Sequence, residues 1–156
     1  NKMNEKKVDF LVYSHKLDTR YGINKIVTHD KEEVNCCQIE NLNEIYNHPN
    51  YKDCKLIFID ELQFFKNSFE IIKHMVEKDR KFIIASGLDT DYKREPFGDV
   101  IKCITIANDV EKFSGKCSYC DNDSLFSKRI WGGTSTIGVG SDSYAPVCRD
   151  CYISES

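Results

Sequence analysis

Two Cys-x-x-Cys pairs near the end of the sequence constrain its fold more than any other feature. Cys117 and Cys120 form the first pair, and Cys148 and Cys151 form the second. Two residues between ligands let one tight turn direct both thiolates at the same ion, and four thiolates complete a tetrahedral Zn²⁺ site. The spacing therefore predicts one structural zinc ion with no open position for catalysis. Four unrelated buried cysteines, or a redox-active pair, are the alternatives.

The predicted zinc ion would clamp the base of a long loop, because residues 121–147 lie between the two pairs. The other four cysteines, Cys36, Cys37, Cys54 and Cys103, lie outside these two pairs. No secretory context favours disulfides over metal binding. From Gly115 onward the sequence is rich in Cys, Gly, Ser and Asp and has little helical periodicity. We therefore expect an α/β domain over residues 1–114 and a small zinc-ribbon domain over residues 115–156.

Short apolar runs predict a parallel α/β sheet in the first of these domains. The expected strands span residues 8–13, 55–60 and 81–87. Between the last two, apolar residues recur at helical spacing over residues 68–80, with Asn67 and Glu70 placed to form a capping box. Strand, helix and strand within about 30 residues is the length of one βαβ unit. A further helix is expected over residues 39–46.

Charge and hydropathy exclude two classes of partner. The formal net charge of −3 is opposite in sign to that of proteins that bind nucleic acid without sequence preference. No apolar run approaches the length of a membrane span, and the first residues do not resemble a signal peptide. These features predict a cytoplasmic globular protein with neither membrane nor nucleic acid as a partner.

Asp60 and Glu61 follow an apolar run at the point where a buried parallel strand would emerge from the sheet. Ligands of open α/β sheets bind at that edge. An apolar strand that ends in Asp is also how P-loop NTPases hold Mg²⁺, and an adjacent Glu is placed to accept a proton. A solvated strand end or a helix cap is the alternative for the same residues.

The block Asp60-Glu61-Leu62-Gln63-Phe64-Phe65 resembles the Asp-Glu-x-Gln-Phe-Phe signature of the zinc-containing thymidine kinase family, which carries a lasso loop. Three further blocks occur in the family's order: residues 16–21 followed by 28–30, residues 87–98, and residues 141–149. The resemblance implies a P-loop NTPase fold of the RecA-like type with a parallel sheet, plus a small zinc-ribbon lasso domain. It covers nearly the whole chain, from about Val8 to Tyr152.

The resemblance also implies roles for individual residues. Glu61 would be the catalytic base that takes the proton from the 5′-hydroxyl of the nucleoside, and Asp60 would hold Mg²⁺ with ATP. The remaining implied cofactor-binding residues are Gln63 beside Asp60 and Asp18, Thr19 and Arg20 near the phosphates. The implied thymidine-binding residues are Leu88, Tyr92, Phe97, Ser127, the lasso residues Ser135, Thr136, Ile137, Gly138 and Val139, and Tyr144. A surface ion pair for Arg20, and core packing for Tyr92, Phe97 and Tyr144, are the structural alternatives.

The activity that the resemblance implies is transfer of the γ-phosphate of ATP to thymidine, which gives dTMP for DNA precursor synthesis. The same resemblance implies structural Zn²⁺, Mg²⁺ with ATP, feedback binding of dTTP, and a homo-oligomer, either a tetramer or a dimer.

The sequence departs from the family at the phosphate-binding loop. No glycine precedes Gly22, so the Gly-rich loop that cradles phosphates is absent, and with it a strand and a helix of about 30 residues. We expect that this segment is missing from the sequence rather than lost with the activity, because Asp60 and Glu61 remain. A catalytically dead relative that acts as a zinc-ribbon interaction module is the alternative, and a zinc ribbon that binds nucleic acid is a weaker one. Val139, where the lasso often shows a glycine pair, is a smaller departure.

Overall fold

The structure is a computed structural model that describes residues 10–17, 25–27, 33–130 and 143–154. The chain divides into two compact units. The first, which we call the α/β unit, takes Asn1–Gly87 and Gly98–Ile106, and the second, which we call the cysteine unit, takes Leu88–Phe97 and Ala107–Ser156. The cysteine unit thus includes a loop from well before residue 115. The domain boundary between residues 114 and 115 stays a prediction.

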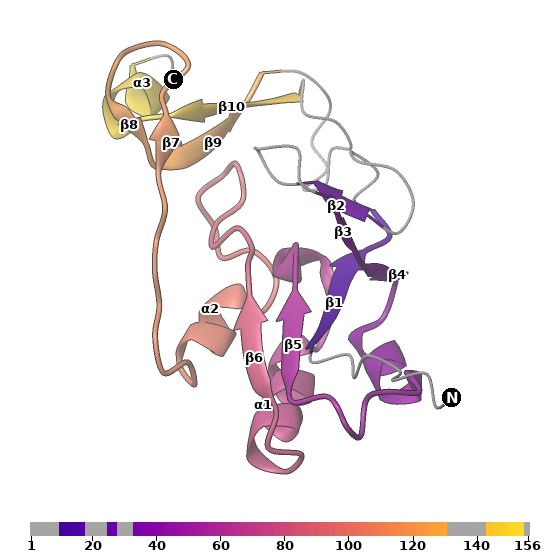
Figure 1. Cartoon of the computed structure of the whole chain (residues 1–156). Helices are drawn as coiled ribbons and strands as arrows, with labels where there is room; N and C mark the ends of the chain where they lie inside the picture. The colour runs from indigo at the N-terminus through magenta and orange to yellow at the C-terminus, as the bar shows by residue number, and fades with distance from the viewer. Residues whose placement is uncertain (1–9, 18–24, 28–32, 131–142, 155–156) are drawn as a thin grey trace. The chain divides into compact units, whose positions relative to one another are not determined.

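Four parallel strands form the sheet of the α/β unit, in the order β4-β1-β5-β6 (Figure 1). The strands are β1 (Phe10–His15), β4 (Cys37–Ile39), β5 (Leu56–Ile59) and β6 (Phe82–Ala85). Strands β5 and β6 lie within the expected runs of residues 55–60 and 81–87, and β1 overlaps the expected run of residues 8–13 but extends to His15. The predicted α/β fold with a parallel sheet is confirmed.

Helix α1 (Ser68–Glu77) connects β5 to β6 and completes the predicted βαβ unit. Its buried side chains include Ile71, Ile72 and Met75, which recur at helical spacing and pack into the core. The predicted capping box of Asn67 and Glu70 at the start of α1 is wrong. Asn67 occupies the N-cap position with a left-handed backbone, φ 55°, and its side chain makes no cap hydrogen bond.

The segment expected as a helix over residues 39–46 is instead divided between two elements. β4 ends at Ile39, and a 3₁₀ helix, η1 (Leu42–Asn47), follows it. The Glu44 carboxylate accepts hydrogen bonds from the backbone N–H of Asn41 at 2.9 Å and of Glu40 at 3.0 Å. These bonds stabilise the tighter start of η1, and the Asn41 bond is the main reason that the pKa of Glu44 is lowered. Helix α2 (Val100–Ile104) was not predicted.

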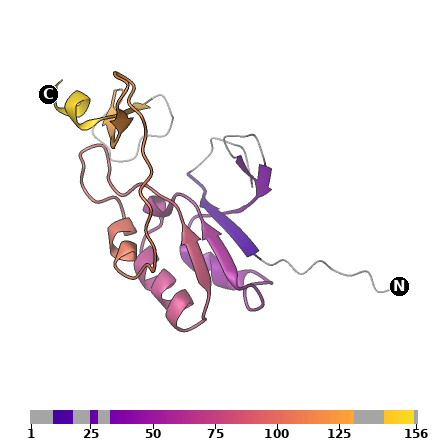
Figure 2. The ribbon, with the colours of Figure 1, turned by 60° about the vertical axis from the view of Figure 1, so that its left-hand side comes forward.

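The two faces of the sheet differ in burial. Helices α1 and α2 lie on the same side of β5 and β6 (Figure 2), and the buried core includes Leu11, Tyr13, Leu42, Ile45, Ile57, Ile59, Phe65 and Met75. The side chains of alternate residues point to the other face. On it, Phe82 is 66% exposed and Phe10 is 45% exposed, and the Phe10 and Phe58 rings pack edge to face. Within the described residues, β6 pairs only with β5 and no element covers this apolar face.

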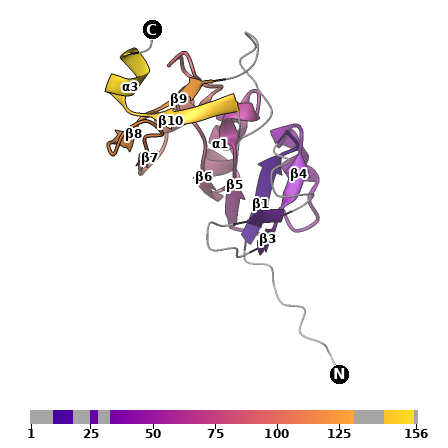
Figure 3. The ribbon, with the colours of Figure 1, turned by 90° about the horizontal axis from the view of Figure 1, so that it is seen from above.

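The remaining strands are short and antiparallel. In the α/β unit, β2 (Lys25–Val27) pairs with β3 (Glu33–Asn35). In the cysteine unit, β7 (Gly115–Lys116) pairs with β8 (Asp123–Ser124), and β9 (Phe126–Arg129) pairs with β10 (Tyr144–Val147). Helix α3 (Arg149–Ile153) follows β10 (Figure 3). None of the helices in the described ranges is both long enough and apolar enough to cross a membrane.

Candidate functional site

Asp60 and Glu61 lie at the carboxyl end of β5, where the sequence placed them. The backbone N–H of Asp60 donates to the carbonyl of Tyr13 at 2.8 Å, which continues the pairing of β5 with β1. Asp60 Oδ1 accepts two hydrogen bonds, from Ser86 Oγ at 2.6 Å and from the Glu61 N–H at 3.0 Å. Both bonds engage one oxygen, and within the described residues Oδ2 accepts none, so it can serve as a ligand for a hard cation, which prefers carboxylate oxygen.

Glu61 begins the 3₁₀ turn η2 (Leu62–Phe64) and has a left-handed backbone, with φ 56°. This conformation is uncommon for a residue with a side chain, and such residues cluster at functional sites. Glu61 Oε2 accepts a hydrogen bond of 2.5 Å from Gln63 Nε2. The Gln63 side chain is buried and thus orients the carboxylate of Glu61.

Two glycines enclose Gln63. A Cβ atom on Gly87 would lie 2.8 Å from Gln63 Oε1, and a Cβ atom on Gly98 would lie 2.5 Å from the Gln63 carbonyl oxygen. Gly98 also has φ +58°, which side chains rarely adopt. The turn that carries Glu61 and Gln63 therefore requires a residue without a side chain at position 98.

Gly98→Ala is accordingly expected to destabilise the α/β unit by about 2 kcal/mol or more, since it adds a backbone clash to an unfavourable φ. Urea denaturation followed by circular dichroism would measure the change. Gly115→Ala is the matched control, because its Cβ would meet only the Ser124 hydroxyl oxygen at 3.1 Å and it has no positive φ. Equal losses for the two variants would contradict the role of Gly98.

His15 lies at the carboxyl end of β1, beside the same turn. Its side chain is buried, Nδ1 accepts from the Leu17 N–H at 3.0 Å, and its ring packs against Phe65 at a centroid distance of 4.8 Å. Burial lowers the pKa of His15, although a hydrogen bond and the charge of Glu40 act in the opposite direction. The folded state therefore favours the neutral imidazole.

A lowered folded pKa means that the unfolded chain binds the proton more tightly. The stability that His15 contributes is thus present above its ordinary value of 6.5 and is lost as the pH falls below it. We expect the free energy of unfolding to fall between pH 7 and pH 5.5, with a slope from this group of at most about 1.4 kcal/mol per pH unit. His15→Gln keeps an acceptor for Leu17 and should flatten that slope. An unchanged slope in the variant would assign the pH dependence to other groups.

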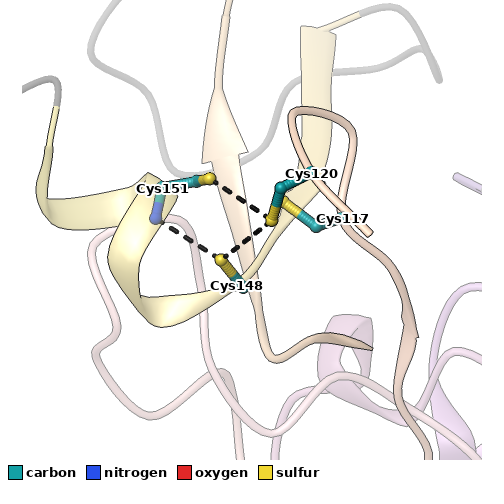
Figure 4. A group of neighbouring side chains, drawn as sticks. All are labelled: Cys117, Cys120, Cys148 and Cys151. Atoms are coloured by element: carbon teal, nitrogen blue, oxygen red, sulfur yellow. Dashed lines mark hydrogen bonds between the residues drawn. The ribbon is translucent and has the colours of Figure 1, made fainter. Parts of the chain in front are cut away.

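The four cysteines of the two pairs come together as one cluster. Their sulfur atoms all lie within 4.8 Å of one another, and in Figure 4 they point toward a common centre. Cys120 Sγ lies 3.6 Å from Cys148 Sγ and 3.7 Å from Cys151 Sγ. A tetrahedron with Zn–S bonds of about 2.3 Å has sulfur–sulfur edges of about 3.8 Å. The cluster can therefore hold a metal ion of the size that four thiolates select.

Backbone N–H groups point at two of these sulfurs. Cys148 Sγ accepts from the Cys151 N–H at 3.4 Å, and this bond lowers the pKa of the Cys148 thiol. Burial acts to raise the pKa of Cys117, but backbone donors, including Tyr119 at 3.5 Å, outweigh burial and lower that pKa to about 6. Donors of this kind favour the thiolate, which is the form that binds metal.

The hairpin of β9 and β10 separates the cysteine cluster from several of the predicted substrate residues. Val147 is fully buried and packs with Phe126 beside the cysteines. Ser127 and Arg129 occupy the alternate positions of β9, and Tyr144 lies directly opposite Arg129. Strand alternation therefore places Ser127 and Tyr144 on one face and the packing around the metal ligands on the other.

Arg129 brings Tyr92 to this face. Its guanidinium carbon lies 4.3 Å from the centre of the Tyr92 ring and 5.1 Å from that of Tyr144, and its Nη2 donates to the Tyr144 hydroxyl at 2.6 Å. The Tyr92 and Tyr144 rings are 6.2 Å apart. Of the predicted substrate residues, Tyr92 and Tyr144 thus contact Arg129, and Ser127 lies two residues before it on the same face of β9.

The remaining predicted site residues either lie elsewhere on loop 88–97 or fall outside the described residues. Leu88 and Phe97 begin and end the loop that carries Tyr92, and Leu88 is exposed. Asp18, Thr19, Arg20, Ser135, Thr136, Ile137, Gly138 and Val139 lie outside the described residues. The roles assigned to all of these residues, including those of Asp60, Glu61 and Gln63, stay predictions.

Comparison with known proteins identifies the family. The family model described as thymidine kinase matches residues 1–152. The chain belongs to the thymidine kinase family. The chain is 36% identical over 140 residues to thymidine kinase of Oryza sativa subsp. japonica, an alignment that covers 87% of this chain and 52% of that protein. For thymidine kinase a of Arabidopsis thaliana the identity is 38% over 140 residues, with 87% and 59% covered.

A viral thymidine kinase, from Myxoma virus strain Uriarra, is 35% identical over 144 residues, which cover 91% of this chain and 78% of that protein. The chain thus spans about half the length of the two plant relatives and most of the viral one. Nothing in these similarities favours the alternative of an interaction module.

Within a thymidine kinase fold, three residues matter that the sequence analysis did not single out. Ser86 bonds Asp60, Gly98 permits the turn that carries Gln63, and Arg129 joins two predicted substrate residues. The position of Ser86 at the end of an expected strand next to Gly87 was an available signal, since parallel strand ends meet at one edge of the sheet. Arg129 had no comparable signal, because its partners are distant in sequence.

Proposed function

We propose that the protein that carries this chain is a thymidine kinase, which transfers the γ-phosphate of ATP to the 5′-hydroxyl of thymidine and gives dTMP. The observation that carries the proposal is the pair Asp60 and Glu61 at the carboxyl end of β5, held by Ser86 and Gln63. The names of the plant and viral relatives support the choice of thymidine as the substrate.

Glu61 would accept the proton of the thymidine 5′-hydroxyl as that oxygen bonds to phosphorus. The Gln63 amide donates to Glu61 Oε2 and so fixes the orientation of the carboxylate. Asp60 would hold Mg²⁺ through Oδ2, while Ser86 and the Glu61 N–H hold Oδ1. Bound Mg²⁺ would neutralise charge on the phosphates of ATP. Phosphoryl transfer depends mainly on such positioning and electrostatic stabilisation.

The ATP phosphates also need a cradle of backbone N–H groups, which we expect from a strand and a helix outside the described residues. The exposed side chains of Phe10, Phe82 and Ile84 support this proposal, because the faces of parallel sheets are normally covered by helices. The outer edge of β6, which pairs only with β5 among the described residues, is a suitable place for the additional strand, since an unpaired edge exposes backbone groups that require partners.

We propose zinc as the ion of the cysteine cluster, because four thiolates at these distances suit a tetrahedral site. Purified protein is expected to contain one equivalent of zinc by elemental analysis. Less than half an equivalent, together with disulfides among these four cysteines, would contradict the proposal.

The kinase proposal is tested by incubating the intact protein with ATP, Mg²⁺ and one nucleoside at a time. Thymidine should be converted to dTMP, and deoxycytidine and deoxyguanosine should not. The kinase proposal would be overturned by a preparation that phosphorylates another nucleoside but not thymidine. It would also be overturned by a folded, zinc-loaded protein that transfers no phosphate. Feedback binding of dTTP and a homotetrameric or dimeric assembly remain expectations from the family, and a cytoplasmic location remains an expectation from the sequence.

A further inference from the structure

Tyr152 connects the cysteine cluster to the loop of residues 88–97. It follows the predicted metal ligand Cys151 in helix α3, and its hydroxyl donates to the backbone carbonyl of Tyr92 at 2.8 Å. The Tyr152 ring packs edge to face against Phe126, at a centroid distance of 5.7 Å, within the cluster that surrounds the cysteines. The Tyr152 side chain therefore has one end in the cluster and the other on the loop.

Arg94 makes the second contact between the same loop and helix. Its guanidinium carbon lies 4.5 Å from the centre of the Tyr152 ring and 5.8 Å from that of Phe126. Arg94 also has a left-handed backbone, φ 66°, which is unfavourable for a long side chain. A cation placed over two rings offsets such a cost. The Arg94 contact therefore adds to the Tyr152 hydrogen bond in holding loop 88–97 against α3.

The loop itself is preformed by internal hydrogen bonds. The buried carboxylate of Asp91 accepts from the N–H groups of Lys93 at 2.8 Å and Glu95 at 3.0 Å, and Thr90 pairs with Pro96. These bonds within the loop hold it in one conformation. Its position therefore depends on its contacts with neighbouring elements rather than on its own conformation.

We propose that Tyr152 is a positioning residue that makes the placement of loop 88–97 depend on the metal in the cysteine cluster. Metal binding would fix the last turn before Tyr152, and Tyr152 would hold the Tyr92 backbone and carry the Arg94 stack. The consequence for thymidine rests on the proposed function, since Leu88, Tyr92 and Phe97 are predicted to contact the nucleoside. The dependence of the loop on Tyr152 and metal does not rest on it.

Other contacts of the loop limit the size of the effect, and one of them is the bond from Lys112 Nζ to Asp89 Oδ2 at 2.6 Å. Arg129 holds the Tyr92 ring from β9, a strand that contains no cysteine. Loss of the Tyr152 hydroxyl should therefore loosen the loop without releasing it. A single hydrogen bond of ordinary net strength corresponds to a change of about threefold to tenfold in the opening equilibrium.

Trypsin can report the loop directly, because Lys93 and Arg94 are cleavage sites at its tip. We expect cleavage after these residues, mapped by mass spectrometry, to be about threefold to tenfold faster in Tyr152→Phe than in the unchanged protein. Removal of metal with a chelator should accelerate it at least as much, and added zinc should restore the slow rate. Cleavage after Arg80, in the α/β unit, serves as the internal reference and should not change.

Tyr119→Phe is the matched control. Tyr119 lies between the first two cysteines, is 50% exposed, and its hydroxyl makes no hydrogen bond within the described part of the chain. It should cleave like the unchanged protein. Equal cleavage rates in unchanged, metal-free and Tyr152→Phe protein, with the reference site also unchanged, would overturn the inference.

Thymidine titration separates this inference from the kinase proposal. Tyr152→Phe should weaken thymidine binding about threefold to tenfold and raise KM by a similar factor, with much less change in kcat, because Tyr152 itself touches no reacting atom. Failure of the unchanged protein to bind thymidine would overturn the kinase proposal and leave the cleavage result standing. A fall in kcat at unchanged KM would overturn the positioning role.

Discussion

Glu61→Gln is expected to lower the turnover of thymidine by about 10²-fold or more in the intact protein. The substitution preserves the size of the side chain and removes its capacity to accept a proton. Gln63 already donates to Glu61 Oε2, so the new amide can still accept that hydrogen bond through its oxygen. The turn should therefore keep its shape, and thymidine affinity should change much less than turnover. Steady-state kinetics and a thymidine titration on the same preparation would separate the two effects.

Glu77→Gln provides the matched control, because Glu77 is an exposed carboxylate in the last turn of α1, away from the strand ends. It should retain normal turnover. If Glu61→Gln also retains near-normal turnover, the base is another group and the role assigned to Glu61 is wrong. A parallel loss of turnover and of folded structure would instead assign Glu61 to the stability of the left-handed turn.

Cys148→Ser is expected to weaken thymidine binding by on the order of tenfold or more while the α/β unit stays folded. Cys148 is the N-cap of α3, and its sulfur accepts from the Cys151 N–H. Serine is a favourable N-cap, so the substitution preserves the start of the helix but removes a thiolate ligand. Without metal, the two cysteine pairs would no longer be joined, so β9 and β10 would gain conformational freedom that the nucleoside must restrict on each binding event.

Nucleoside titration and circular dichroism on the same metal-stripped sample would measure this effect. Cys103→Ser is the control, since it makes the same chemical change in α2, outside the cysteine cluster. It should bind zinc and thymidine normally. Unaltered thymidine affinity in folded, zinc-free Cys148→Ser protein would show that the cysteine unit does not shape the nucleoside site. That result would favour the interaction-module alternative.

Apolar patterns over a few consecutive residues predicted the three longer strands of the sheet and helix α1. The runs that became β1 and β5 are apolar because a central parallel strand is buried on at least one face, and α1 has apolar residues at helical spacing. The same apolar pattern predicted β6, which is an edge strand with mostly exposed residues within the described part of the chain. The segment at residues 39–46 was misassigned because its apolar residues suit either a helix or a strand followed by a tight turn. Pairing with β1 over Cys37–Ile39 decided between them, and that pairing depends on residues more than 20 positions away.

The capping box shows the same limit on a smaller scale. Asn67 and Glu70 have the correct spacing, as do Asn41 and Glu44, but only the second pair forms the bonds. Asn67 has a left-handed backbone instead of the extended one of Asn41, and its side chain makes no cap hydrogen bond. Spacing therefore identifies a candidate cap, whereas the path of the preceding chain determines whether the cap forms.

The sequence by itself determined the parallel α/β class, the four cysteines of the metal cluster and the position of Asp60 and Glu61 at a strand end. Each of these three features depends on residues that are close together in sequence or on a repeated short motif. Local backbone geometry restricts the structures that such residues can form. Only the tertiary structure decided that Ser86 bonds Asp60, that Gly98 lies against Gln63, and that loop 88–97 lies on α3 and β9. These contacts join residues 26 to 60 positions apart, and at that separation the packing of whole elements, rather than any local preference, brings two side chains together.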